Sequence, residues 1–301
     1  MRAKLTTGPI DYQQEFKRAR VRQFDQDLRR MTAEQLKKEF GASSSGRVLV
    51  KELCRNVVYQ AYSWIQRGKA PAIDGNLRSL FYQWMKPVLA KIPKLLGRMK
   101  TDPYDEMLNA MEYFIVDLKL FRYEDFGLVD ERWENRFFSD GRKPDVLVFA
   151  EKNGFVKFLQ EVSRKFGVHA VALGGSPSHL STEYLVGQLR KKFKSFEPLV
   201  LYGITDYDPS GADIAASFRE QLERQGVKVA GLHQLVEPKA FLAEEVDTFR
   251  FPVPSKYPTR VQRWLKEGSG FDGQAFGLEA DSLPKQRLLE ILDKMLFLLN
   301  K

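Results

Sequence analysis

The chain has little cysteine and no long apolar run. Its 301 residues include a single cysteine, Cys54, so no internal disulfide bond can form, which is typical of a reducing compartment. No segment approaches the roughly 18 consecutive apolar residues of a membrane span, and the first residues lack the apolar core of a secretion signal. These absences predict a cytoplasmic protein without a membrane partner.

Two common catalytic patterns are missing as well. The three histidines and the cysteine do not have the spacing of zinc ligands. The sequence contains no Gly-x-x-x-x-Gly-Lys-Ser/Thr loop, the motif that cradles the phosphates of ATP in many enzymes. We therefore expect no ATP hydrolysis by this chain, so any ATP-driven step needs a separate subunit.

The positive charge of the chain is concentrated near its beginning. The net charge is +9, but residues 1–100 hold 21 Lys and Arg against 8 Asp and Glu, whereas residues 101–301 hold 27 against 31. Clustered basic residues are the electrostatic signature of binding to a phosphate backbone, although they also serve to keep a surface solvated. The distribution indicates a phosphate-backbone partner, such as double-stranded DNA, for the first third of the chain.

The first part of the chain has helical periodicity. Residues 1–46 are polar and end in a Gly- and Ser-rich stretch, which predicts a basic N-terminal arm and linker. Residues 47–130 contain apolar faces at helical spacing over 48–64, 76–89 and 103–119. Three helices with basic side chains are typical of a helix-turn-helix or winged-helix DNA-binding domain.

The second part of the chain alternates between strand and helix patterns. The polar, turn-rich residues 131–144 predict a linker, and residues 145–301 predict an α/β domain. The apolar runs have the length and β-branched character of strands buried on both faces, as in a parallel sheet. Strands are predicted at 145–150, 168–173, 199–205 and 227–232, and helices at 153–166, 180–194, 211–225 and 284–299.

Acidic residues follow two of these predicted strands. Glu151 follows the first strand, and Asp206 and Asp208 follow the third, in the pattern Asp-x-Asp-x-x-Gly. A calcium-binding EF-hand loop is excluded, because its twelfth position is Ser217 and a strand precedes it. Two interpretations remain: a turn in which Asp208 caps the next helix, and a Mg²⁺ site formed where parallel strands end.

This arrangement of acidic residues resembles the Toprim domain. The segments Val146–Lys152, Gly174–Thr182 and Gly277–Pro284 are similar to segments of the topoisomerase VI A subunit and of the related meiotic double-strand-break transesterase. The resemblance implies an α/β Toprim domain, preceded by a mainly α winged-helix (CAP-like) domain. It also implies that Glu151, Asp206 and Asp208 bind Mg²⁺ and that Glu151 takes part in catalysis.

The same family has a nucleophilic tyrosine in its winged-helix domain. The family motif is roughly Ser-x-Arg-Asp/Glu-x-Tyr-Tyr, and here Arg78 and Tyr82 match it, whereas Ser79 replaces the acidic residue and Phe81 the first tyrosine. The resemblance implies that Tyr82 attacks the phosphodiester. A guanidinium such as Arg78 lowers the pKa of a phenol and stabilises the charge on phosphorus.

The resemblance implies Mg²⁺-dependent cleavage of both DNA strands by tyrosine transesterification, as in a type IIB DNA topoisomerase. It also implies a homodimer, a nucleoid-associated location and, in the topoisomerase reading, a separate ATPase B-type subunit. A stand-alone DNA-cleaving relative needs no such subunit. Two alternatives are a Toprim nuclease that uses metal-activated water and a DNA-binding recombination accessory protein.

Overall fold

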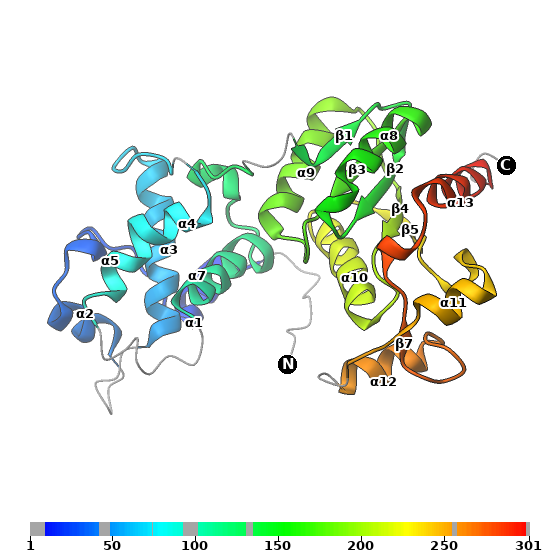
Figure 1. The fold of residues 1–301 in the computed structure, drawn as a ribbon. Helices are drawn as coiled ribbons and strands as arrows, with labels where there is room; N and C mark the ends of the chain where they lie inside the picture. Colours follow the sequence, from blue (N-terminus) through cyan, green and yellow to red (C-terminus); the bar gives the residue numbers. More distant parts are fainter. Residues whose placement is uncertain are drawn as a thin grey trace. The chain divides into compact units, whose positions relative to one another are not determined.

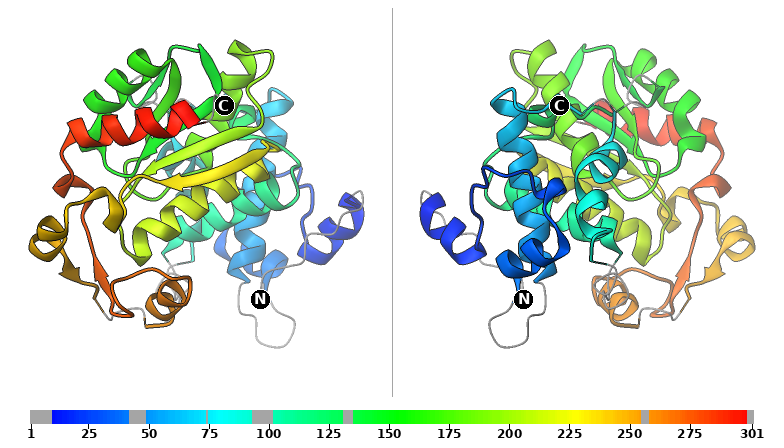
Figure 2. Two further views of the ribbon diagram at one scale, coloured as in Figure 1. Left: turned by 90° about the vertical axis from the view of Figure 1, so that its right-hand side faces the viewer. Right: turned by 90° about the vertical axis from the view of Figure 1, so that its left-hand side faces the viewer.

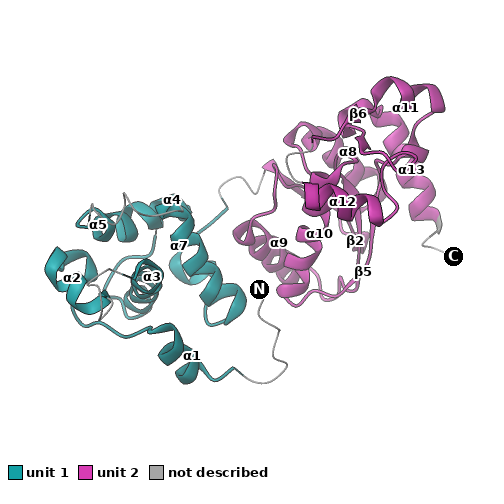
Figure 3. Ribbon diagram, turned by 90° about the horizontal axis from the view of Figure 1, so that it is seen from below, with its two compact units in different colours: residues 1–131 teal, residues 132–301 magenta. Residues whose placement is uncertain are grey.

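The chain divides into two compact units, residues 1–131 and residues 132–301 (Figure 3). Among the described residues, no helix is long and apolar enough to cross a membrane. The computed structural model describes residues 10–41, 49–73, 75–92, 102–130, 135–254 and 258–298.

Unit 1 is mainly helical in the part that the structure describes. Its longest described helix, α3 (Val50–Gln66), lies in the middle of the unit (Figure 1). The predicted apolar face of this helix is confirmed at Leu53, Val57 and Ala61, which are buried. The other described helical elements are α1 (Tyr12–Ala19), η1 (Leu28–Arg30), α2 (Ala33–Phe40), α4 (Leu77–Leu80), η2 (Phe81–Met85), α5 (Lys86–Leu89), α7 (Pro103–Glu112), η3 (Tyr113–Asp117) and η4 (Tyr123–Phe126).

Residues 10–41 of the predicted N-terminal arm contribute to the core of unit 1. Leu28, Leu36 and Phe40 are buried, which contradicts the expectation of a polar arm outside a compact domain. Two buried amides of α3 hold this segment through its backbone. Asn56 accepts a hydrogen bond from the backbone N–H of Arg22 at 2.8 Å, and Gln60 accepts one from that of Leu28 at 3.0 Å.

The winged-helix expectation is met only in its mainly α character. In the described residues of unit 1, β-type backbone pairing is limited to isolated bridges, such as the one between Gly75 and Leu128. No pair of strands forms a wing in this part of unit 1. The predicted helix over 76–89 is present as α4, η2 and α5 in succession, and the turn η2 has π-helical geometry.

Unit 2 is built on a five-stranded, mostly parallel sheet. The order of its strands is β1-β3-β2-β4-β5, and β1 alone is antiparallel to its neighbour. The four predicted strands are confirmed with shifts of one or two residues at their ends. The strands are β1 (Phe137–Ser139), β2 (Lys143–Ala150), β3 (Val168–Ala172), β4 (Leu199–Ile204) and β5 (Val229–Gln234).

Helices cover both faces of this sheet. In β2, Val146 and Val148 face one apolar core, whereas Leu147 and Phe149 face the other, as expected for a strand buried on both sides. The first core includes α8 (Val156–Phe166) and α13 (Lys285–Leu298), which lie beside each other (Figure 2). The second includes α9 (His179–Lys192) and α10 (Pro209–Arg224).

The structure corrects the predicted linker over 131–144. Strand β1 and the start of β2 belong to the sheet, so residues 137–139 and 143–144 are not a connection between domains. Strand β1 has only three residues, too few to show an alternating pattern in the sequence. The remaining described elements of unit 2 are η6 (Asn153–Phe155), η7 (Pro238–Ala240), α11 (Ala243–Phe249), β6 (Phe251–Pro252), α12 (Pro258–Lys266), β7 (Phe276–Gly277) and η8 (Ala280–Ser282).

We predict that Gln60→Leu destabilises unit 1 by about 2 kcal/mol, because it leaves the buried N–H of Leu28 and the carbonyl of Gln26 without their partner. Urea unfolding followed by circular dichroism measures this change. The matched control is Gln13→Leu at an exposed position, which we expect to alter stability by less than about 0.5 kcal/mol. Equal effects of the two substitutions would contradict the role assigned to Gln60.

Candidate active-site groups

The three predicted metal ligands of unit 2 lie at the ends of two neighbouring strands. Strands β2 and β4 are parallel partners, with Ala150 opposite Ile204. Glu151 follows β2 directly, and its backbone N–H donates to the carbonyl of Ile204 at 3.0 Å. The chain leaves β2 toward β3 on one side, while β4 lies on the other. This is the switch point at which open α/β sheets bind ligands.

Asp208 caps helix α10. Its Oδ1 accepts a hydrogen bond from the backbone N–H of Gly211 at 2.7 Å, so the capping interpretation of this residue is confirmed. The motif requires glycine at its last position, because a Cβ on Gly211 would lie 2.0 Å from the carbonyl oxygen of Asp206. The Asp-x-Asp-x-x-Gly spacing therefore has a local structural cause, and it also keeps both aspartates beside the strand end.

Negative charge is partly uncompensated at this strand end. Burial, and then the charge of Asp206, raise the pKa of Glu151, and burial also raises the pKa of Asp208. The Oε2 atom of Glu151 is buried and has no hydrogen-bond partner. A buried carboxylate oxygen without a donor is costly, and a cation relieves that cost.

Lys152 supplies a cation to this acidic group. Its ammonium lies 3.0 Å from Asp206, 3.1 Å from Asp281 and 3.9 Å from Glu279. Burial by itself lowers the pKa of Lys152, but its hydrogen bonds to Asp206 and Asp281 outweigh burial and raise it. Sequence reasoning assigned no role to Lys152 or Asp281. The place of Lys152 directly after Glu151 was the one signal that pointed to it.

The segment that carries Asp281 is tied to the loop of Asp206. The backbone of Leu278 pairs with that of Tyr207, and the N–H of Ala280 donates to Oδ1 of Asp206 at 2.8 Å. The side chain of Asp206 thus receives two donors, the ammonium of Lys152 and this N–H. The acidic stretch before α13 therefore belongs to the candidate site.

Carboxylate oxygens are the hard ligands that Mg²⁺ prefers, and the unpartnered Oε2 of Glu151 is an oxygen of this kind. In the described residues, however, no three His, Cys, Asp or Glu side chains are arranged to hold a metal ion. Lys152 contacts Asp206 in this arrangement. The ammonium of Lys152 thus occupies the place beside Asp206 that a metal ion bound by these carboxylates would share.

Tyr82 lies in unit 1, on the π-helical turn η2. Its side chain is 53% exposed. It borders a cavity of about 260 Å³ together with Arg78 and Tyr104, and the other lining residues are Phe81, Asp102 and Pro103. Single π-turns within helices are frequent at functional sites. The structure thus brings the two motif residues, Arg78 and Tyr82, to the wall of one cavity.

The cavity contains two tyrosines that differ in their surroundings. The guanidinium of Arg78 lies 5.5 Å from the ring centre of Tyr104, and the ammonium of Lys86 lies 4.7 Å from that of Tyr82. Burial raises the pKa of Tyr104. Both rings thus have a cation beside them, and Tyr82 is the more exposed of the two side chains.

No protein-family model matches the sequence, and no curated protein matches it. The candidate site therefore depends on the geometry described above and on the motif resemblance.

We predict that Glu151→Gln raises the Tm of the metal-free protein at pH 7. The pKa of Glu151 is raised in the folded state, so its contribution to stability is lost as the pH rises through the interval between the unfolded and folded pKa. The gain in Tm should shrink below the ordinary Glu pKa of about 4.3, where the carboxyl is protonated in both states. Scanning calorimetry across pH measures it, and an unchanged or lower Tm at pH 7 contradicts the prediction.

We predict that Lys152→Met lowers the Mg²⁺ concentration needed for half-maximal thermal stabilisation by at least about 10-fold, because a competing cation is removed from Asp206. The same variant should have a lower Tm without metal, since three carboxylates lose their partner. The control is Lys157→Met, at an exposed position of α8. Weaker Mg²⁺ binding by Lys152→Met would show that Lys152 organises the site instead.

Proposed function

We propose that this protein is a Mg²⁺-dependent DNA-cleaving transesterase, in which unit 2 is a Toprim-type domain and unit 1 is a winged-helix-type domain that carries the nucleophile Tyr82. One observation carries the proposal. Glu151, Asp206 and Asp208 gather at the switch point of a parallel sheet, and a buried oxygen of Glu151 has no partner there. Carboxylates gathered in this way can hold a divalent cation that neutralises the phosphate of a phosphodiester.

The topology of unit 2 supports the Toprim assignment. Its parallel strands stand in the order β3-β2-β4-β5, so the strand before Glu151 is central and pairs with the strand before Asp206. The segment around Glu279 and Asp281, which resembles a closing stretch of the same family, contacts the Asp206 loop. Three separate motifs of the resemblance are therefore close in space, although they are far apart in the sequence.

The chemistry assigned to unit 1 is nucleophilic attack by a phenolate. The phenol of Tyr82 loses its proton to solvent, and its oxygen then attacks the phosphorus. The bond from phosphorus to the 3′ oxygen breaks, and the products are a 5′-phosphotyrosyl link and a 3′-hydroxyl. Arg78 borders the cavity and the ammonium of Lys86 lies 4.7 Å from the ring centre of Tyr82, so both cations can stabilise negative charge that develops during the attack.

A Mg²⁺ ion held by the carboxylates would supply charge neutralisation for the phosphate. Glu151, Asp206 and Asp208 are the residues that would hold it. The family resemblance implies a homodimer in which Tyr82 of one copy acts together with the carboxylates of the other copy. The two copies would then cut the two DNA strands. A topoisomerase role requires a separate ATPase subunit, whereas a stand-alone DNA-cleaving role does not.

A hydrolytic Toprim nuclease is the second candidate. It is favoured by Ser79 and Phe81, which replace the acidic residue and the first tyrosine of the family motif. The remaining arginine of that motif, Arg78, lies beside the ring of Tyr104 as well as in the wall of the cavity that Tyr82 borders. In this candidate, Glu151 acts as a general base toward water, in keeping with its raised pKa and its unpartnered oxygen. The accessory-protein alternative lacks any such specific observation.

We predict that incubation with supercoiled plasmid and Mg²⁺, followed by denaturation, yields DNA covalently bound to protein. Tyr82→Phe should reduce the adduct by at least about 10³-fold, because the loss of a covalent nucleophile removes the pathway. Asp208→Ala should abolish it as well, whereas Tyr12→Phe, at another exposed tyrosine of unit 1, should leave it intact.

The same assay separates the alternatives. Hydrolysis is identified if the DNA is cut without forming an adduct, if this cutting survives Tyr82→Phe, and if it is lost in Asp208→Ala. An adduct that is lost in Tyr104→Phe and kept in Tyr82→Phe would move the nucleophile to the second tyrosine of the cavity. Absence of cutting by the wild type, with or without Mg²⁺, would contradict a self-sufficient DNA-cleaving enzyme.

A further inference from the structure

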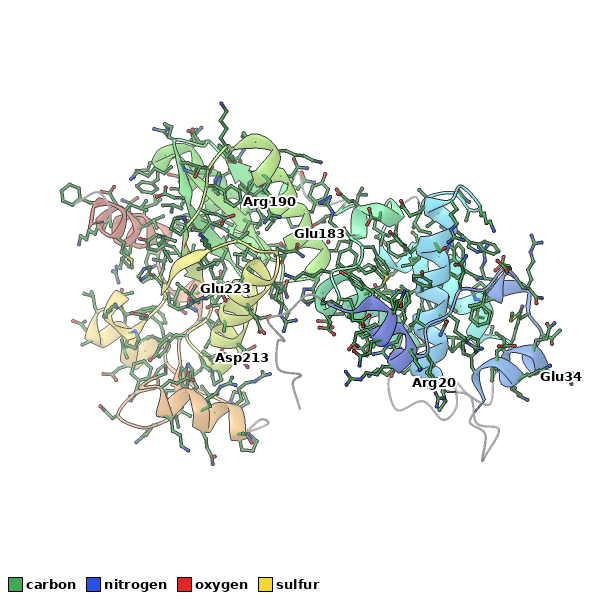
Figure 4. The ribbon with its side chains drawn as sticks, turned by 180° about the vertical axis from the view of Figure 1, so that it is seen from behind. Arg20, Glu34, Glu183, Arg190, Asp213 and Glu223 are labelled. Atoms are coloured by element: carbon green, nitrogen blue, oxygen red, sulfur yellow. The ribbon has the colours of Figure 1, made fainter. Side chains whose placement is uncertain are left out.

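Basic residues gather at the edge of unit 2 where its parallel strands begin. Helix α8 ends with the exposed Arg164 and Lys165, and helix α9 ends with the exposed Arg190, Lys191 and Lys192. Figure 4 labels Arg190 on α9. Helices that cross between parallel strands end where the next strand starts, so the fold brings these residues to the same edge of the sheet.

Hydrogen bonds join the segments at this edge. The guanidinium of Arg142 donates to the carbonyl of Arg164, and Lys192 donates to the carbonyl of Ser139 at 3.1 Å. Arg190 donates to the carbonyl of Gln225 at 2.8 Å. Segments 139–143, 164–167, 190–198 and 225–228 are therefore contiguous, and we call them the basic edge.

The basic edge has a large excess of positive charge. Its four segments hold nine Lys and Arg against two acidic residues, Asp140 and Glu197, while the whole of residues 132–301 holds 25 against 22. The remainder of unit 2 is thus net acidic. Asp140 pairs with Arg142 at 2.8 Å. The basic edge therefore keeps an excess of positive charge even when both acidic residues are subtracted.

Favourable interaction with helix dipoles does not account for all of these cations. Lys and Arg in the last turn of a helix interact with its unpaired carbonyls, which explains residues such as Lys165 and Lys191. Arg142, Lys194 and Lys228 are exposed and lie outside the described helices. Holding like charges together on a surface is unfavourable unless a polyanion or counterions neutralise them.

We propose that the basic edge binds the phosphate backbone of duplex DNA, as a second contact surface that is separate from the carboxylates. The identity of the polymer rests on the proposed function. An acidic protein partner is less favoured, because interfaces between proteins have an apolar centre. The exposed large apolar side chains described in unit 2, Leu242, Phe249 and Phe297, all lie outside the four segments.

The position of the basic edge separates it from the cleavage chemistry. Strands β2 to β5 have five to eight residues, and the carboxylates follow their other ends. At about 3.3 Å per residue, the two edges are roughly 17–26 Å apart. A duplex along the basic edge is therefore held without being placed at Glu151, Asp206 and Asp208. The surface retains DNA and does not cut it.

The test is fluorescence anisotropy of the full chain with a labelled 30-base-pair duplex in EDTA, over a series of salt concentrations. The paired substitution Lys191→Glu with Lys194→Glu should raise Kd by at least about 10-fold at 0.1 M salt. It should also reduce the slope of log Kd against log salt concentration by about one to two units. The control pair, Lys157→Glu with Lys266→Glu, makes the same change in net charge at exposed positions outside the basic edge and should change Kd by less than about 3-fold.

A second pair, Lys165→Glu with Lys228→Glu, takes one residue from each of two other segments and should reproduce the loss. Equal Kd values for the basic-edge pairs and the control pair overturn the inference, as does tighter binding of single-stranded RNA than of the duplex. The adduct assay with Mg²⁺ on the same variants tests the proposed function separately. If the basic-edge variants bind the duplex more weakly but the wild type forms no adduct, the results support this inference alone. If the wild type forms the adduct and the basic-edge variants bind the duplex as the control pair does, the results support the proposed function alone.

Discussion

The pairing of β2 with β4 is the constraint on which the candidate site of unit 2 depends. It places Glu151 beside Asp206 and Asp208, and burial by the helices on both faces of the sheet raises the pKa of Glu151 and Asp208. Carboxylates in such a place repel one another and lack solvent, so the fold needs a cation there. Lys152 supplies one in this structure, through Asp206 and Asp281. We therefore interpret Lys152 as the internal counter-ion of this group of carboxylates, which Mg²⁺ would displace under the proposed function.

The two edges of the sheet in unit 2 have opposite character for one topological reason. Parallel strands with crossover helices gather all strand ends at one edge and all helix C-termini at the other. Acidic residues that follow strands thus meet at the first edge, and basic residues that end helices meet at the second. The same topology provides one surface suited to a metal ion and another suited to phosphate. The proposals made above therefore concern opposite edges of the sheet of unit 2: metal binding at one edge and DNA binding at the other.

Local sequence patterns were sufficient for most of the secondary structure. The strands at 145–150, 168–173 and 199–205 were predicted because four or more consecutive apolar residues, bounded by polar ones, are buried on both faces. The acidic residues that follow two of them were also found, since strand order in a parallel sheet constrains where strand ends lie. Strand β1 was missed because three residues show no period. The N-terminal segment has apolar residues at helical spacing, but its partner could not be predicted, because its attachment to α3 depends on Asn56 and Gln60, which lie more than thirty residues further along the chain.

The sequence by itself determined the α/β character of the second half, the mainly helical character of the first, and the presence of Glu151, Asp206 and Asp208 after strands. Only the tertiary structure decided the partners of these residues. The contact of Lys152 with Asp281 spans 129 positions, and the basic edge combines four segments of a half whose total charge is nearly balanced. Periodicity and capping act over a few residues and can be read locally. Ion pairs and charged surfaces depend on the distances that folding creates between remote parts of the chain.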